Sequence, residues 1–260
     1  WSFHVAGIII KAPDIVKTTR DNITMTDRLD PPEPWLDFLR WQSEQTRATC
    51  RYLARRCALR RGILLDLACG RGHVSEKLLE TRPELRLVGL DHDINILPAP
   101  GNGLIPVCGG AEALPFADAA VDFVLFHFSL MWVDPRSALA EARRVLKPGG
   151  KLLLCAEPDY AGMIVEPDPG DRKPMIMRLA RGIERVGGDP YLGRKLPRLL
   201  DETGFRLEDY GLSSRPSLYR REDWPSLERV FRFRSYFHPR SGPRWCANLK
   251  RLLRKQTYLE

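Results

Sequence analysis

The sequence contains no long apolar run. The longest one near the N-terminus, Val5 to Ile10, is far shorter than the roughly 20 apolar residues that a membrane-spanning helix needs. We therefore expect no membrane span. The sequence also begins at Trp1 instead of a methionine, so we expect the natural chain to start further upstream, where it could carry a targeting segment.

Cysteine pairs with metal-ligand spacing are missing as well. No Cys-x-x-Cys pair occurs, and no histidine lies at ligand spacing from a cysteine. We therefore expect no metal site, and we expect the cysteines to be buried free thiols in a reducing compartment, the cytoplasm. The six cysteines are Cys50, Cys57, Cys69, Cys108, Cys155 and Cys246.

Residues 1–210 lack net charge, although the whole chain of 260 residues carries +8. Residues 211–260 contain 12 Lys and Arg against 4 Asp and Glu, so the excess lies entirely in this tail. Such a tail could bind an anionic substrate, bind nucleic acid, or form a solvated helical face. Its arginines alternate with apolar residues at helical spacing, which predicts two helices, residues 224–237 and 245–255, packed on the rest of the protein.

A third glycine is absent from the one glycine turn that follows an apolar strand. Ile63 to Leu67 predicts a buried strand, and Gly70 and Gly72 lie in the turn before a helix that starts near His73. A nicotinamide or flavin fingerprint would place another glycine at position 75, where this chain has Ser75. The turn can still bring backbone N–H groups close to a ligand, but it excludes a nicotinamide dinucleotide.

Strands and helices alternate after this turn. Apolar segments at residues 86–91, 105–108, 121–126 and 151–156 predict four more strands, and residues 135–145 predict an amphipathic helix that ends before Gly149. Residues 205–210 predict a sixth strand. This alternation predicts an α/β fold, namely a doubly wound, mostly parallel, Rossmann-like sheet with helices on both faces.

Asp91 ends the second predicted strand, 19 residues after Gly72. An acid at this distance can accept hydrogen bonds from both ribose hydroxyl groups of a nucleotide. The alternative is that Asp91 only caps the following segment. A helix there would be short, because Pro98 and Pro100 stop it.

Five short motifs resemble those of one enzyme family. In order they are D-L-A-C-G-R-G, V-G-L-D, A-E-A-L-P-F, V-D-F-V-L-F-H-F and R-V-L-K-P-G-G-K-L-L-L. Together they cover residues 63–157 and resemble the small-molecule branch of the class I S-adenosylmethionine (SAM) methyltransferases. That branch includes the ubiquinone/menaquinone-type enzymes.

The resemblance implies a SAM site. Asp66 and the backbone of Ala68, Gly70 and Gly72 would hold the amino-acid part of SAM, with Ala68 replacing the family's first glycine. By the same resemblance, Asp91 would bind the ribose. Three residues would contact the adenine, namely His92, Ala111 and Glu112. Many relatives have aspartate where this chain has Gly110, so that contact is lost or moved.

The resemblance also places His127 and Phe128 near the transferring methyl group. His127 is the candidate general base, because imidazole titrates near neutrality; the alternative is that it only shapes the pocket. Glu157, Asp159 and Tyr160 follow the fifth strand and are the candidate acceptor-binding residues. The two acids could also hold a cation, but no further acid at suitable spacing supports a metal.

The domain organisation follows from these assignments. We expect residues 1–60 to form an N-terminal arm and helical lid, with Val5 to Ile10 either a strand or an apolar arm. Residues 61–210 would form the SAM-binding domain, with a substrate-facing insertion at 158–200. Residues 211–260 would be a basic helical addition on the same domain. The family's antiparallel seventh strand has only residues 256–259 available, so we expect it to be short or incomplete.

The function we expect is methyl transfer from SAM to an oxygen, nitrogen or carbon atom of a small-molecule acceptor. An RNA or DNA methyltransferase is the alternative, with the basic tail as its footprint. Relatives that methylate base amines carry an Asn/Asp-Pro-Pro-aromatic box after the fourth strand, whereas this chain has His127-Phe128-Ser129-Leu130. A non-catalytic SAM-fold partner protein is the third possibility. The sequence does not predict an oligomeric state.

Overall fold

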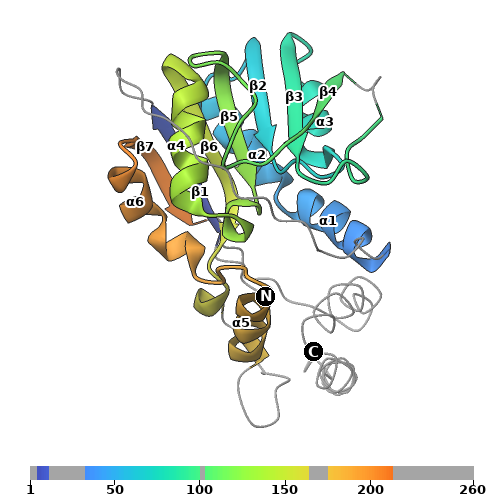
Figure 1. Cartoon of the computed structure of the whole chain (residues 1–260), viewed down its shortest axis with the longest axis vertical. Coiled ribbons are helices and arrows are strands. Elements are labelled where there is room, and N and C mark those ends of the chain that lie inside the picture. The colour runs from blue at the N-terminus through green and yellow to red at the C-terminus, as the bar shows by residue number, and fades with distance from the viewer. Residues whose placement is uncertain (1–4, 12–32, 100–102, 164–174, 213–260) are drawn as a thin grey trace, which may run out of the picture.

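The chain forms a seven-stranded sheet with helices on both faces (Figure 1). The computed structural model describes residues 5–11, 33–99, 103–163 and 175–212. The strand order is β4-β3-β2-β5-β6-β1-β7. The first five strands in this order are parallel, which confirms the predicted α/β class with its Rossmann-like sheet.

Apolar runs form the parallel strands, because all but the edge strand β4 are largely buried between two layers of helices. The bounds of these strands are Gly62–Leu67 for β2, Leu85–Asp91 for β3, Leu104–Cys108 for β4, Val121–His127 for β5 and Leu146–Pro158 for β6. β6 starts earlier and ends later than the predicted run at 151–156. Because these strands are parallel, their carboxyl ends lie at one edge of the sheet, and the strand order reverses between β2 and β5.

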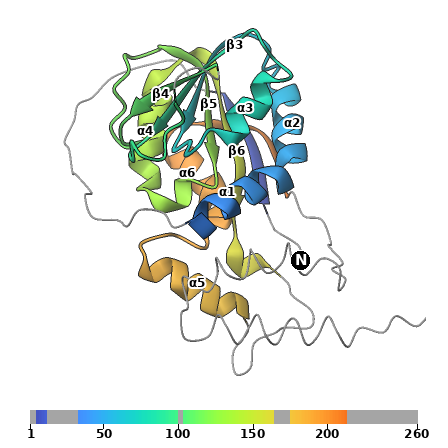
Figure 2. The ribbon, with the colours of Figure 1, turned by 90° about the vertical axis from the view of Figure 1, so that its right-hand side faces the viewer.

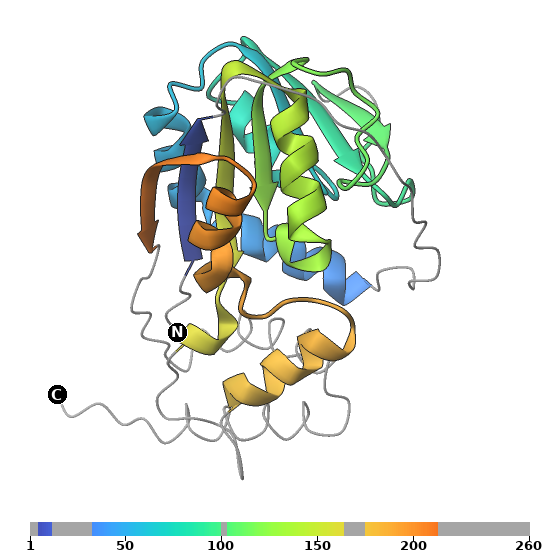
Figure 3. The same ribbon diagram turned by 60° about the vertical axis from the view of Figure 1, so that its left-hand side comes forward.

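An N-terminal strand fills the antiparallel position of the sheet. β1 (Val5–Lys11) lies between β6 and β7 (Arg206–Leu212) and is antiparallel to both. The open alternative for this segment is therefore settled in favour of a strand. In Figure 3, β1 is the dark blue arrow beside the orange β7. Residues 256–259, the expected source of an antiparallel strand, lie outside the described residues.

Two layers of helices enclose the sheet. α2 (Arg47–Arg56) and α3 (His73–Leu79) cover one face, while α4 (Pro135–Val145) and α6 (Leu192–Glu202) cover the other. Side chains alternate between the faces along each strand: Leu64 packs with the α2–α3 layer, and Leu65 packs with the α4–α6 layer. The predicted stripe of Cys50, Leu53 and Cys57 on α2 is buried, as its helical spacing requires.

The remaining helices gather near the carboxyl edge of the sheet. α1 (Glu33–Gln45) runs below the ends of the central strands and meets α2 at Thr46, and α5 (Met175–Arg185) lies further from the sheet (Figure 2). Short 3-10 helices, η1 (Leu130–Trp132) and η2 (Tyr160–Gly162), follow β5 and β6. No helix forms between β3 and β4 in the described part of that connection, which includes Pro98.

Two expectations fall largely outside the described residues. Both predicted helices of the basic tail lie outside them, as do residues 213–260 of that tail and part of the 158–200 insertion, whereas residues 211 and 212 end β7. Within the described ranges, no helix is long and apolar enough to cross a membrane.

Candidate functional site

The turn after β2 is built from left-handed backbone conformations. Ala68, Gly70 and Gly72 have φ angles of 52°, 55° and 75°. Glycine adopts this conformation without strain, whereas the Cβ of Ala68 makes it unfavourable by about 1–2 kcal/mol. Gly72 is also the residue that begins α3, so the turn directs the first N–H groups of that helix toward the carboxyl edge of the sheet. This geometry fits the backbone cradle that the sequence predicts.

Asp66 does not point into open space. Its buried carboxylate accepts a hydrogen bond from the hydroxyl of Ser75 in α3. Burial raises the pKa of Asp66 to about 7, the hydrogen bond from Ser75 lowers it, and the negative charge of Asp91 raises it further. Asp66 therefore joins β2 to α3 and holds the glycine turn between them.

Asp91 closes the turn from the neighbouring strand. Its Oδ2 accepts a hydrogen bond of 2.8 Å from the N–H of Gly70, and its Oδ1 accepts one of 3.1 Å from the N–H of Asp93. The exposed His92 places Nδ1 3.2 Å from the same Oδ1. A carboxylate has about four acceptor positions, so Asp91 retains capacity for hydroxyl donors. The structure thus brings Asp66, Gly70, Gly72 and Asp91 together at one place.

The segment after β4 lies next to this group along the same edge. Ala111 is buried, and Glu112 Oε1 accepts a hydrogen bond of 2.8 Å from the N–H of Asp134, which begins α4. Arg144 and Glu141 of α4 hold the same connection. Arg144 donates to the carbonyl oxygens of residues 114 and 116, and Glu141 accepts from the N–H of residue 114. α4 therefore fixes the path of the predicted adenine-binding segment.

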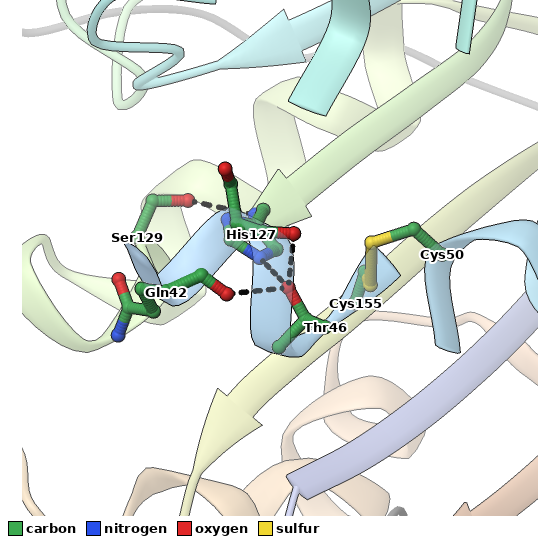
Figure 4. The surroundings of a disulfide bond; sticks show 7 residues. Gln42, Thr46, Cys50, His127, Ser129 and Cys155 are labelled. Atoms are coloured by element: carbon green, nitrogen blue, oxygen red, sulfur yellow. Dashed lines mark hydrogen bonds between the residues drawn. A yellow bond between two sulfur atoms is a disulfide. The ribbon is translucent and has the colours of Figure 1, made fainter. Parts of the chain in front are cut away.

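His127 ends β5 and contacts the junction between α1 and α2. Its Nε2 lies 2.7 Å from Oγ1 of Thr46, and the Thr46 hydroxyl also lies 3.0 Å from the carbonyl oxygen of Gln42 (Figure 4). Burial lowers the pKa of His127 to about 3. The imidazole is therefore neutral at physiological pH, and it is a weak base.

Three non-glycine residues adopt left-handed backbone conformations at the ends of the three central strands. They are Ala68 after β2, Phe128 after β5 and Ala156 near the end of β6, with φ angles of 52°, 53° and 69°. Each conformation costs about 1–3 kcal/mol and persists only where the surroundings enforce it. Of the five described non-glycine residues with left-handed backbone, these three lie at the edge where open α/β sheets bind ligands, while Ala58 and Ala119 lie in turns elsewhere. Phe128 is buried there, and its ring packs edge-on against His127.

Glu157 is the most enclosed acid at this edge, with 0% exposure. Its Oε1 accepts hydrogen bonds from the N–H groups of Ser129 and Leu130, at 3.0 and 3.2 Å. No described group donates to its Oε2. Burial raises the pKa of Glu157 to about 7, and the backbone hydrogen bonds oppose that shift. This carboxyl group therefore titrates near neutrality, and its Oε2 is buried without a hydrogen-bond partner among the described residues.

The other two acceptor-binding candidates are placed differently. Asp159 forms an ion pair of 2.9 Å with Arg194 of α6 through Oδ2, and its Oδ1 has no partner among the described residues. Tyr160 is buried in the core cluster on the α4–α6 side of the sheet. Tyr160 thus contributes packing at the end of β6, while Asp159 faces the insertion.

The free-thiol expectation is wrong for two cysteines. Cys50 of α2 and Cys155 of β6 form a disulfide, whereas Cys57, Cys69 and Cys108 are free. Atoms of Cys50, Cys155 and His127 that could bind a metal lie within 4.8 Å of one another. The sulfur atoms are bonded to each other and His127 Nε2 contacts Thr46, so these donors are already engaged. The sequence could not show the pair, because the two positions are 105 residues apart.

Sequence reasoning missed three polar residues that organise the site. Thr46 contacts His127, and Ser75 binds Asp66. Ser129 accepts a hydrogen bond from the His127 N–H and donates one to the carbonyl oxygen of Leu67, so it joins the ends of β5 and β2. Only Ser129 carried a usable signal, since it directly follows the His127-Phe128 pair.

A cavity of about 540 Å³ lies away from this edge. It is lined by Arg56 and by residues 206–209 at the start of β7, beside the amino-terminal half of β6. Arg56 and Asp209 in its wall form an exposed ion pair of 2.8 Å. None of the strained backbone and none of the candidate residues lies there, so we assign the site to the carboxyl edge.

A comparison with known protein families matches the part of the chain that forms this edge. Residues 65–154 match the protein family described as a methyltransferase domain. Malonyl-(acyl-carrier protein) O-methyltransferase of Dechloromonas aromatica is 34% identical over 93 residues, which are 36% of this chain and 36% of that protein. An uncharacterised 37.1 kDa protein in transposon TN4556 of Streptomyces fradiae is 34% identical over 154 residues, 54% of this chain and 42% of that protein.

A solved structure shares the fold. The structure of a putative methyltransferase of Bacillus halodurans aligns with a TM-score of 0.51 and 23% identity, over 73% of this chain and 81% of that one. The chain spans about one third to two fifths of the length of the curated relatives above. The similarity therefore concerns the sheet and the turn after β2 more than the parts that would select an acceptor.

Proposed function

We propose that this protein, whose residues 65–154 form a class I SAM-dependent methyltransferase domain of the type 11 branch, transfers a methyl group from SAM to a small-molecule acceptor. The observation that carries the proposal is the hydrogen bond from the N–H of Gly70 to Asp91 across a turn of left-handed residues. This hydrogen bond places an acid with free acceptor capacity beside backbone that can approach a ligand closely.

The residues present fit SAM. We assign the amino-acid part to the backbone of Ala68, Gly70 and Gly72, held in place by Asp66, and the ribose to Asp91. His92, Ala111 and Glu112 would line the adenine, and His127 and Phe128 would lie beside the reacting carbon. SAM supplies a methyl carbon that its sulfonium already activates, so the protein mainly has to orient the acceptor and exclude water.

In this proposal, two residues have the remaining roles, which are proton removal and shaping the pocket at the methyl group. His127 remains the candidate beside the transferring methyl group, but a pKa of about 3 means that it holds a proton weakly. Glu157 has a pKa of about 7, close to the operating pH at which a general base works best. We therefore assign proton removal from an O–H or N–H acceptor to Oε2 of Glu157, and pocket shape at the methyl group to His127. Asp159 would contact the acceptor.

The outer parts of the molecule would enclose the acceptor. α1 and α2, within the N-terminal segment 1–60, would form a lid over the SAM-binding domain at 61–210. The insertion at 158–200 and the basic tail at 211–260 would complete the acceptor pocket. Three free cysteines are consistent with a cytoplasmic location, which we also propose.

Calorimetry tests the cofactor first. SAM and S-adenosylhomocysteine should bind one per chain, and NAD should not bind, because the turn lacks the third glycine. Binding of NAD in preference to SAM would refute the proposal. If neither methylation product nor SAM binding is found in the folded full chain, a role as a partner protein is favoured instead.

Identifying the acceptor needs a second experiment. Small molecules released from the purified full chain would be incubated with the enzyme and methyl-labelled SAM, and labelled products separated by mass. A labelled small molecule supports the proposal. Label incorporated only into RNA, with binding that weakens steeply as salt rises, would support nucleic-acid methylation instead.

A further inference from the structure

Two contacts side by side fasten the α1–α2 pair to the sheet. Thr46 and Cys50 are one helical turn apart, and they meet His127 and Cys155, which are register partners on β5 and β6 (Figure 4). One contact is a hydrogen bond and the other is the disulfide. The disulfide is adjacent to the proposed methyl-transfer position. Whether it is oxidised or reduced therefore affects the position of α2 at that edge.

The other cysteines indicate that this disulfide can open. Within the described residues, Cys57, Cys69 and Cys108 are free, and Cys108 is exposed. A chain that keeps an exposed thiol free is typical of a reducing compartment, where disulfides are mostly transient and regulatory.

The surroundings of Cys50 fit attack by an anionic thiol. A small surface pocket is lined by Cys50 together with three cationic side chains, Arg47, Arg51 and Lys77. Positive charge attracts an anionic thiolate and stabilises the sulfur anion of cysteine. Cys155, at 1% exposure, does not line this pocket. Cys50 is itself only 6% exposed, but it lines the pocket, so it is the more accessible sulfur of the pair.

We propose that Cys50–Cys155 is a reversible redox latch, opened by a small anionic thiol of the glutathione class and closed by the corresponding disulfide. Closed, it holds α2 against β6 beside His127; open, it lets the α1–α2 pair move away from the carboxyl edge. The consequence for methyl transfer rests on the function proposed above, whereas the latch itself does not.

The chemistry balances as two thiol–disulfide exchanges. A thiolate attacks Cys50 Sγ, the Cys50–Cys155 bond breaks, and Cys155 leaves as a thiolate that takes a proton from solvent. A second thiolate attacks the outer sulfur of the mixed disulfide and releases Cys50, which is protonated in turn. Two small thiols are oxidised to one small disulfide, and the two electrons reduce the cysteine pair.

The test uses the full chain in buffers of reduced and oxidised glutathione, with alkylation and peptide mass spectrometry. Cys50 and Cys155 should change state together in one two-electron transition, while Cys57 stays reduced. Arg51→Gln should slow reduction by glutathione about fivefold and leave reduction by neutral dithiothreitol unchanged. Arg55→Gln, on the same helix but outside the pocket, is the matched control.

Hydrogen exchange tests the mechanical part. Amides of α1 and α2 should exchange about tenfold faster in the reduced wild type than in the oxidised one, and the double variant Cys50→Ser, Cys155→Ser should match the reduced protein. If that variant does not fold, the comparison between reduced and oxidised wild type still tests the latch. Equal exchange in both states, a pair that glutathione never reduces, or one tightly bound zinc ion per reduced chain would overturn the latch. None of these measurements involves SAM.

Discussion

Thr46 Oγ1 lies 2.7 Å from Nε2 of His127 and joins the start of α2 to the end of β5. The two residues are 81 positions apart. Because Thr46 also contacts the carbonyl oxygen of Gln42 in α1, the single side chain holds the helix junction and the candidate site residue together. The orientation of His127 thus depends on the helices that lie over the carboxyl edge.

Thr46→Val should destabilise the protein by about 1–3 kcal/mol, because it leaves a buried imidazole nitrogen without its partner. Thr203→Val is the matched control, since Thr203 Oγ1 makes the same local bond to a carbonyl four residues back and has no histidine partner. Denaturant unfolding of both variants measures the difference. Equal losses in the two variants would show that the contact with His127 contributes nothing.

Asp91→Asn should weaken SAM binding by about 1.5–3 kcal/mol, the usual contribution of hydrogen bonds to a charged group. Calorimetry measures the affinity, and circular dichroism checks the fold. Glu208→Gln removes an acid of β7 that pairs with Lys151 away from the carboxyl edge, and it should leave SAM affinity unchanged. An unaltered affinity in folded Asp91→Asn would remove this residue from the site.

Glu157→Gln should remove a limb near pH 7 from the pH profile of kcat and reduce turnover by about 10²–10⁴. The limb arises because the pKa of Glu157 is about 7, and only the ionised form can accept a proton. His127→Asn should keep this limb, because the pKa of His127 is about 3. Should His127→Asn lose the limb while Glu157→Gln retains it, the two roles would have to be exchanged.

Glu157→Gln should also change how the free energy of unfolding depends on pH. The pKa of Glu157 is raised from 4.5 to about 7 in the folded protein, so the folded state keeps a proton that the unfolded state loses. The stabilisation that Glu157 gains from keeping this proton is fully present below pH 4.5 and is lost as the pH rises toward 7. Compared with wild type, Glu157→Gln should therefore be relatively more stable at pH 8 than at pH 4.5.

Glutamine suits this test because its carbonyl oxygen can accept from the N–H groups of Ser129 and Leu130, and its amide replaces the unpartnered Oε2. Unfolding titrations at several pH values give the comparison. Parallel curves for wild type and variant would mean that folding does not shift the pKa of Glu157.

Reduction of the Cys50–Cys155 disulfide should lower the free energy of unfolding by about 2–4 kcal/mol, because the bond closes a long loop in the unfolded chain. Denaturant midpoints with and without dithiothreitol measure the loss. The double variant Cys50→Ala, Cys155→Ala is the control and should show no effect of the reductant. A reductant effect of equal size in that variant would assign the loss to another group.

Local patterns were enough to predict the parallel sheet and the turn after β2. Apolar runs of strand length, a helix ending before Gly149 and the order of the acids are short-range features, because strand burial and left-handed turns depend on neighbouring residues. The clustering of Asp66, Gly70 and Asp91 follows from them, since adjacent parallel strands end at the same edge.

Tertiary structure alone decided the contacts between distant segments. The pairing of β1 with β6 and β7, the disulfide between Cys50 and Cys155, and the contact of Thr46 with His127 each join residues far apart in the chain. No local periodicity encodes such partners, because they are set by how helices pack over the sheet. The pKa values of His127 and Glu157 also arose only on folding, since burial rather than residue type moved them.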